Sequence, residues 1–565
     1  MRVALLAAIA LLSTSDGSPA APAAPPGDPA TGDPDPGSGE LSADGVAALR
    51  ALLEAGVHPD LLWPDFASLR EDARRFYEAR GETLAWIRRS GPTAQARALA
   101  DVLRSSEAMG LDPGDYDGPR WARRLEPGAR PPSEAGRVRL DVALTVSVLR
   151  YVSDVRLGRV DPGPLRVGLG EAAAVDLAGV AGELAGADDV RLVLERLEPP
   201  FAAYRRTLDA LRTYLRLARE APGEPLPVPA TPLEPGAFYP AAPRLATVLR
   251  RLGDLRDGEG AARDETVYAP ALVEAVRRFQ ARHGLDPDGR LGARTVSALN
   301  VPLSRRVMQL ALTLERWRSG PRSVAAPLIV VNIPEYRLRA LGAEGRPELA
   351  MRVVLGAAYR HQTPVFVAGL RTVVFRPYWN VPRGITRNEL LPRLAGDPDL
   401  LARERYDLVD RRGDVAGVEL TPEALRLLRT GELRLRQRPG PANALGLVKF
   451  VFPNTHEVYL HGTPSPRLFA RSRRDFSHGC IRVEDPLALA EWVLHDDPRW
   501  SADAITAAMN GTRTRVVDVG RPIPVLIVYG TAVVSERGEV RFLDDVYGHD
   551  AALERALASR RPYPD

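Results

Sequence analysis

Ser477-His478-Gly479-Cys480-Ile481-Arg482 is the stretch that decides how the rest of this chain is interpreted. Cys480 is the only cysteine among 565 residues, so no disulfide can form within the chain. A lone cysteine is often an inert thiol buried in a core, and from the cysteine alone that interpretation stays open. A histidine nineteen residues upstream, His461, is the first observation that favours a catalytic thiol instead.

The segment 447–461, just upstream, is predicted to form a β-hairpin. Apolar residues alternate in its first half, Pro453-Asn454 makes a turn, and a second strand returns to His461. Because side chains alternate between the two faces of a strand, Tyr459 and His461 should point to the same face. The pattern therefore places a phenol and an imidazole side by side.

Cys480, His461, His478 and Gly479 are the predicted catalytic residues. A thiol with a pKa of roughly 8.5 is mostly protonated at neutral pH, and a neighbouring imidazole can accept its proton. We expect His461 to be this base, because a strand can present it rigidly, and His478 to shape the oxyanion site or orient the thiol. Gly479 permits close backbone approach, so the amides of residues 479 and 480 could converge on one oxygen. The alternative is a metal site of His461, His478 and Cys480, although it lacks a clear fourth ligand.

The sequence on both sides of this stretch predicts a β-rich domain over residues 325–535. Period-two and β-branched runs follow Pro327, and Pro524 to Val534 adds a last apolar strand. Helical, charged sequence interrupts the pattern at 383–440, and an insertion of that size is more often a functional lid than structural filler. Residues 536–565 are assigned to a C-terminal extension.

The first half of the chain is predicted to be helical. Apolar residues recur at helical spacing through residues 42–238, with Pro and Gly breaks between segments. Residues 243–302 form a compact unit around an amphipathic helix at 271–280, and residues 303–320 form a connecting helix. The predicted fold class is therefore α+β with several domains.

The N-terminal residues carry an export pattern. Arg2 precedes an apolar run and then small residues, which indicates a signal peptide over residues 1–21 and a periplasmic location. Residues 22–41 are rich in Pro, Gly, Asp and Ala, so we expect a disordered linker there. No later segment is apolar enough to span a membrane, so no transmembrane segment is expected in the mature protein.

The overall charge of the chain argues against nucleic acid as a partner. The formal net charge is +4, which does not indicate nucleic acid binding. Nearly all the positive charge is arginine, and Lys449 is the only lysine. No cofactor or metal is expected.

The catalytic stretch and its surroundings resemble the L,D-transpeptidase catalytic domain. The signature consists of His461-Gly462-Thr463-Pro464 followed by Ser477-His478-Gly479-Cys480. The longer segment RQRPGPANALGLVKFVFPNTHEVYLHGTPSPRLFARSRRDFSHGCIRV is similar to the large periplasmic subfamily that combines a helical scaffold domain, a peptidoglycan-binding domain and a lidded, YkuD-type catalytic domain. RRFYEARGETLAWI, GLDPGDY and GRVDP resemble that scaffold, and AVRRFQARHGLDPDGRLGARTVSALN resembles the three-helix peptidoglycan-binding domain.

The resemblance implies a reaction and its partners. Cys480 would attack the carbonyl of the third residue of a tetrapeptide stem, expel D-alanine, and pass the acyl group to an amine of a second stem as a 3–3 crosslink. Peptidoglycan stem peptides and glycan strands would be the partners, with peptidoglycan synthases as further candidates. Carbapenems would acylate Cys480.

Five further residues are candidates for holding the anionic substrate or for ordering the site: Tyr459, Asn443, Ser477, Arg482 and Arg467. Structural salt bridges are the equally open alternative for the two arginines. Two positions depart from the family pattern. Gly462 stands where the subfamily usually has aspartate, which puts a side-chain role after His461 in doubt, and Arg482 stands where the wider superfamily usually has asparagine.

Two other functions stay open on the sequence. The thioester could pass to water, as in an L,D-carboxypeptidase, or to another amine, and the motif does not separate these acceptors. The chain could also be a non-catalytic scaffold that binds the cell wall through its peptidoglycan-binding unit.

Overall fold

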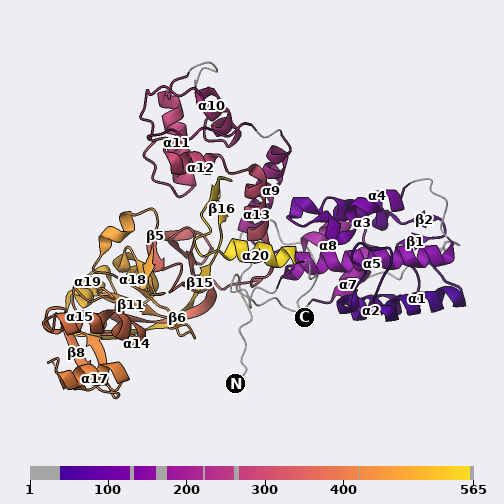
Figure 1. Ribbon diagram of the computed structural model, residues 1–565. Coiled ribbons are helices and arrows are strands. Elements are labelled where there is room, and N and C mark those ends of the chain that lie inside the picture. The colour runs from indigo at the N-terminus through magenta and orange to yellow at the C-terminus, as the bar shows by residue number, and fades with distance from the viewer. Residues whose placement is uncertain are drawn as a thin grey trace. The chain divides into compact units, whose positions relative to one another are not determined.

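The computed structural model describes residues 39–126, 133–160, 175–220, 223–256, 258–259, 266–417 and 419–559 (Figure 1). They belong to two compact units. Of the described residues, we call Ser323–Gly530 the sheet unit, and residues 39–322 together with 531–559 the helical unit. The signal peptide expected at 1–21, and most of the linker expected at 22–41, lie outside the described residues. Within the described ranges, no helix has both the length and the apolar character to cross a membrane.

The sheet unit is built on one large sheet. Its strands are β3 (Leu328–Asn332), β4 (Arg337–Leu341), β5 (Pro347–Gly356), β6 (Phe366–Phe375), β11 (Val448–Val451), β12 (Leu460–His461), β13 (Asp475–Ser477), β14 (Ile481–Val483) and β15 (Arg515–Val528). Their order is β13-β5-β14-β12-β11-β6-β15-β3-β4, and β4 pairs again with β5. The sheet therefore closes on itself, which a strand pattern alone does not predict.

Alternation along the central strands separates a core face from a site face. Val448, Phe450, Leu460 and Ile481 are fully buried, whereas their neighbours on β11 and β14 are only half-buried. Helix α18 (Pro486–Leu494) packs against β5, β11 and β15, and helix α19 (Ala502–Asn510) packs on α18. Helix α18 begins where the Asp485 carboxylate accepts a 2.9 Å bond from the Ala488 amide, as a helix cap does.

The insertion expected at 383–440 contains strands as well as helices. Its elements are β7 (Trp379–Asn380), α14 (Arg383–Ile385), the π-helical turn η4 (Thr386–Leu390), α15 (Leu391–Gly396), α16 (Leu400–Arg403), β8 (Tyr406–Val409), β9 (Val415–Gly417), α17 (Pro422–Thr430) and β10 (Arg434–Gln437). The strands form a separate sheet in the order β7-β10-β8-β9. A core that includes Leu394, Leu408 and Leu435 holds this subdomain together, so it has a hydrophobic centre of its own. Because these strands have only two to four residues each, they show no alternation that the sequence pattern could reveal.

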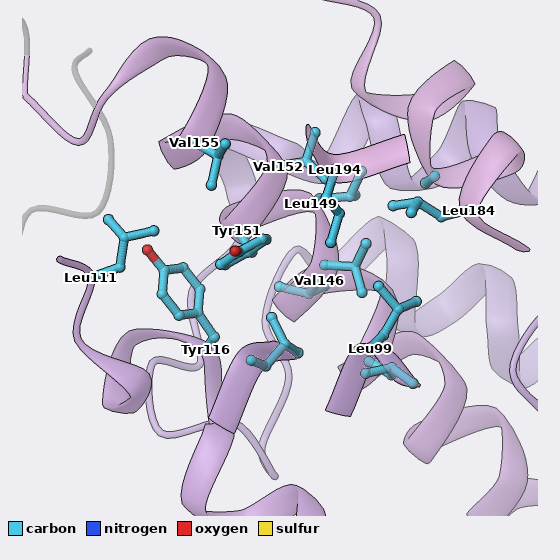
Figure 2. Close-up of a cluster of buried hydrophobic side chains, with 14 of the residues drawn as sticks. Leu99, Leu111, Tyr116, Val146, Leu149, Tyr151, Val152, Val155, Leu184 and Leu194 are labelled. Carbon is cyan, nitrogen blue, oxygen red and sulfur yellow. The ribbon is translucent and has the colours of Figure 1, made fainter. Parts of the chain in front are cut away.

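The helical unit is centred on α5 (Glu134–Leu157). Every residue of α5 from Asp141 to Val155 is buried, so neighbouring helices surround it on all sides. Figure 2 shows Val146, Leu149 and Val152 beside Leu99 and Leu194 in this core. The surrounding helices include α1 (Ala43–Ala55), α2 (Arg70–Ala79), α3 (Ala94–Arg104), α4 (Gly118–Arg124), α7 (Leu177–Gly186), α8 (Val190–Glu195), α9 (Ala202–Arg219) and α13 (Leu303–Arg318).

A buried carboxylate on α5 orders the segment that begins RRFYEARGETLAWI. Asp141 accepts bonds from the Tyr77 hydroxyl (2.7 Å) and from the amides of Ala85 (3.2 Å), Trp86 (2.7 Å) and Ile87 (2.8 Å). The Trp86 indole donates to Thr145, one helical turn further along α5. The aromatic residues of that segment are therefore part of the core.

Replacing Asp141 with alanine should destabilise the helical unit. The change leaves three amides and a hydroxyl without their buried acceptor, which should cost about 3–5 kcal/mol. Urea unfolding of the full chain followed by tryptophan fluorescence would detect it, because Trp86 lies at the site. Asp101→Ala, in an exposed pair with Arg104, is the matched control and should change stability by less than about 1 kcal/mol. Equal midpoints for the two variants would contradict the assignment.

The last described residues, 531–559, return to the helical unit. Strands β16 (Ala532–Val534) and β17 (Val540–Phe542) form a hairpin, and α20 (His549–Ala558) follows. Phe542 packs on Tyr214 of α9 at 5.0 Å between ring centroids, and the Arg306 guanidinium of α13 lies 4.7 Å from its ring. Most of the segment that we assigned to an extension, 536–565, is thus part of this unit's packing.

A smaller hydrophobic core lies within the helical unit, over residues 226–299. Helices α10 (Ala242–Arg251), α11 (Pro270–Arg282) and α12 (Ala293–Leu299) surround it. The expected apolar face of α11 is buried there, with Leu272, Val276 and Phe279 all at or below 1% exposure.

Candidate active site

A tight turn presents the Cys480 thiol at the start of β14. Gly479 has φ +110°, a backbone conformation that side chains rarely adopt. The Ser477 hydroxyl accepts a bond from the Gly479 amide (3.2 Å) and donates one to the Cys480 carbonyl (2.5 Å). The Thr363 hydroxyl donates to the Gly479 carbonyl at 2.8 Å. Ser477 is therefore placed to order the turn, and it occupies the Gly479 amide that we expected to face an oxyanion.

The thiol lies against the segment that leads into β12. Cys480 Sγ is 3.7 Å from the Glu457 carbonyl oxygen, and Glu457 itself has φ +55°, unusual for a residue with a side chain. Burial raises the pKa of the Cys480 thiol above its ordinary value, although hydrogen bonds from the amide and hydroxyl of Tyr459 oppose the shift. Cys480 is therefore a protonated thiol at neutral pH rather than a preformed thiolate.

His461 is buried and held in one tautomer. Its Nδ1 lies 2.6 Å from the Gly462 carbonyl oxygen, and a carbonyl can only accept, so we assign the proton to Nδ1 and the lone pair to Nε2. Burial, then the positive charge of Arg482, lowers the pKa of His461 to about 3. The ring is accordingly neutral, as a general base must be. A backbone carbonyl orients it, which explains how the chain can carry glycine at position 462.

Tyr459 and His461 share one face of the sheet, as the alternation predicted. Their ring centroids are 5.7 Å apart. None of the contacts among the described residues joins the His461 ring directly to Cys480 Sγ, and catalytic contacts often shorten only when substrate binds. The Tyr459 hydroxyl is the side-chain group that hydrogen-bonds to the thiol.

Lys449 lies at this site although the sequence reasoning did not select it. Cross-strand pairing sets Lys449 opposite His461, and His461 opposite Arg482. The Lys449 ammonium lies 3.7 Å from the centroid of the Tyr459 ring. Two features of the sequence could have pointed to Lys449: it is the only lysine, and it alternates with buried Val448 and Phe450 along the strand. Only the register between strands, however, places it beside His461.

His478 points toward the insertion. Its Nε2 lies 2.6 Å from a carboxylate oxygen of Glu389 on η4, and its ring packs on His361 at 4.8 Å between centroids. In this structure the histidine that we expected to support the oxyanion joins the insertion to the catalytic turn.

The other two selected residues lie outside the thiol's contacts. Asn443 is buried and donates to three backbone carbonyls, those of residues 377, 437 and 438, so it orders the loop before β11. Arg467 is exposed on the 3-10 helix η5 (Pro466–Ala470), and among the described residues it makes no hydrogen bond or ion pair with the site.

A protonated resting thiol has a measurable signature. Because the pKa of Cys480 is raised, alkylation by iodoacetamide should be slow at pH 7 and accelerate steadily above pH 9. Intact-protein mass spectrometry measures the extent of alkylation without ambiguity, because the chain has one cysteine. N-acetylcysteine is the control, and its rate should rise at lower pH. A rate that is already at its plateau at pH 6 would instead indicate a thiolate paired with an imidazolium.

Comparison with known proteins adds three family matches. Residues 326–525 match the L,D-transpeptidase catalytic domain, residues 243–299 a domain described as "Putative peptidoglycan binding domain", and residues 71–211 the Scaffold domain. Over 260 residues the chain is 32% identical to a protein of Haemophilus influenzae (strain ATCC 51907 / DSM 11121 / KW20 / Rd) named "Putative L,D-transpeptidase". That region is 45% of this chain and 51% of the relative, so the chain spans about half the length of the curated relative it matches.

Proposed function

We propose that the chain is an L,D-transpeptidase that forms 3–3 crosslinks in peptidoglycan through a thioester on Cys480, and the match of residues 326–525 to the L,D-transpeptidase catalytic domain supports this. The observation that carries the proposal is His461: a neutral imidazole on the site face, pinned through Nδ1 so that Nε2 is left to exchange protons. A cysteine with such a base can carry out acyl transfer without a cofactor.

In the first half-reaction, Cys480 Sγ attacks the carbonyl carbon of the third residue of a tetrapeptide stem. The C–S bond forms, the thiol proton passes to His461, and the tetrahedral oxyanion accepts a bond from the Cys480 amide. The C–N bond then breaks, and His461 gives its proton to the departing amine of D-alanine. The Tyr459 hydroxyl, which already contacts the thiol, stabilises negative charge on sulfur.

In the second half-reaction, the side-chain amine of another stem attacks the thioester. His461 removes a proton from that amine, the new C–N bond forms, and the returning proton restores the Cys480 thiol. Water or another amine in the same position would give a carboxypeptidase or an exchange reaction, so the acceptor decides the product.

The domain matches support the setting in which this reaction would run. A peptidoglycan-binding unit within residues 243–299 would hold glycan strands or stems, and the expected export signal would deliver the chain to the periplasm. The insertion at 383–440 would act as a lid through Glu389 and His478. Peptidoglycan synthases are further candidate partners.

Mass spectrometry of muropeptides tests the proposal directly. Full-length protein is incubated with disaccharide-tetrapeptide, and the products are separated and identified. We expect free D-alanine together with dimers joined between two third residues. Tripeptide monomers without such dimers would establish a carboxypeptidase instead, and the absence of any D-alanine release would leave the wall-binding scaffold as the function.

A further inference from the structure

Two cationic side chains at the site, Lys449 and Arg482, have no acidic partner among the described residues. The Arg482 guanidinium is half-buried, and its Nε is buried with no hydrogen-bond partner in the part of the chain that the structure describes. The Lys449 ammonium contacts the Tyr459 ring. Throughout the described chain, no carboxylate forms an ion pair or hydrogen bond with either group, and the nearest negative charge that acts on both is the ionised form of Cys480.

Elsewhere in the described chain, shielded guanidinium groups reach oxygen acceptors: Arg150 and Arg474 bond to backbone carbonyls, and others pair with carboxylates. Arg282 pairs with Asp254 at 2.6 Å, Arg316 with Asp550 at 2.6 Å, and Arg339 with Glu335 at 2.6 Å. A cation removed from water without an anion is costly, and such groups concentrate at functional sites. Among the described residues neither Lys449 nor Arg482 has a hydrogen bond or ion pair to an oxygen acceptor, so the two cations are open to an anion from outside the chain.

The strand register places the two cations on either side of His461. Lys449 on β11 is opposite His461 on β12, which is opposite Arg482 on β14, so the three side chains form one row on the site face. Cys480 precedes Arg482 by two residues, which puts it on the same face about 7 Å away along the strand. An anion bound in this row would lie next to the reacting sulfur.

We propose that Lys449 and Arg482 form a subsite for the terminal carboxylate of the amino acid that the first half-reaction expels. This inference rests on the proposed function and specifies the substrate at that same site. The expelled residue has its carboxylate one residue step, about 3.8 Å, from the attacked carbonyl. A stem that ends at the fourth residue therefore places a carboxylate within reach of this row.

Binding of that carboxylate would also prepare the base. Arg482 and Lys449 both act to lower the pKa of His461, which keeps the ring neutral in the free protein. A carboxylate between them offsets their charge and makes the ring a better proton acceptor when the thiol attacks. The subsite would thus couple recognition of the correct stem end to proton transfer.

A matched pair of substrates tests the subsite in the full-length protein. The probes are a disaccharide-tetrapeptide with a free C-terminal acid and the same compound as its C-terminal carboxamide, with release of D-alanine or D-alaninamide measured as kcat/KM. We expect wild type to prefer the acid by about 100-fold, from two charge-assisted contacts. Lys449→Gln and Arg482→Gln should each lower turnover of the acid by about 10- to 100-fold and reduce the preference for the acid over the carboxamide to about tenfold or less.

Controls separate the subsite from general damage. Lys449→Arg should restore most of the preference, and Arg371→Gln, an exposed arginine on β6, should leave it unchanged. Equal turnover of acid and carboxamide by wild type, or equal loss of both in the two Gln variants, would overturn the subsite while leaving the transpeptidase proposal intact. If wild type releases neither amine, the transpeptidase proposal fails. The subsite is then decided by calorimetric binding of the two probes to Cys480→Ala, where equal affinity overturns it.

Discussion

Replacing Cys480 with alanine should abolish acyl transfer. The sulfur forms the only covalent bond to substrate in the proposed reaction, so D-alanine release should fall by at least about 10⁴-fold. The same substitution should remove the carbapenem adduct that intact mass would show on wild type. Both measurements address the same atom, and the chain contains no second thiol that could substitute.

The structure predicts little damage to the fold from this change. The thiol is half-buried and its hydrogen bond to the Glu457 carbonyl, at 3.7 Å, is weak. Stability of Cys480→Ala should lie within about 1 kcal/mol of wild type, as measured by urea unfolding. A variant that is folded, yet crosslinks stems as fast as wild type, would end the enzymatic interpretation.

Replacing His461 with glutamine should lower acylation by about 10²- to 10⁴-fold, the range of general acid–base catalysis. Wild type should acylate at a nearly constant rate from pH 5 to 8, because the pKa of His461 is lowered to about 3 and the pKa of Cys480 is raised. His461→Gln should instead accelerate with pH, since only the small thiolate fraction can then attack. Single-turnover D-alanine release across that range provides the test, and parallel pH profiles would contradict the assignment.

Stability gives a second signature of the same histidine. The folded pKa of about 3 lies below the unfolded value of about 6.5, so the unfolded chain binds the proton more readily. The contribution of His461 to stability is therefore complete above pH 6.5 and is lost as pH falls from there toward 3. Wild type should lose more stability over that interval than His461→Gln does.

Local patterns were sufficient to find much of the site. Two-residue alternation placed Tyr459 and His461 on one face, and the structure shows their rings 5.7 Å apart. Composition and spacing also indicated the α+β class, with helices before strands. These are properties of short segments, which a sequence displays directly.

What the sequence concealed depends on pairing between distant segments. The β4–β5 pairing that closes the sheet, the row through Lys449, and the Glu389–His478 contact each join residues from different elements. Asn443 and Ser477 were candidates either for holding the substrate or for ordering the site, and only the structure shows that their polar atoms bond to nearby backbone. These pairings and contacts become known only from the strand register and the tertiary structure.

The path of the chain through the helical unit has a consequence for biogenesis. Phe542 packs on Tyr214 within the helical unit, and residues 323–530 of the sheet unit lie between them in the sequence. The helical unit is therefore the first to be synthesised, but it cannot complete its folding until the sheet unit has also been synthesised. Such long-range contacts slow folding, and they leave the partner surface on α9 uncovered during synthesis. A chain truncated after Gly530 would contain every strand of the large sheet but an incomplete core around Tyr214, so cellular proteases would have a basis for removing unfinished copies.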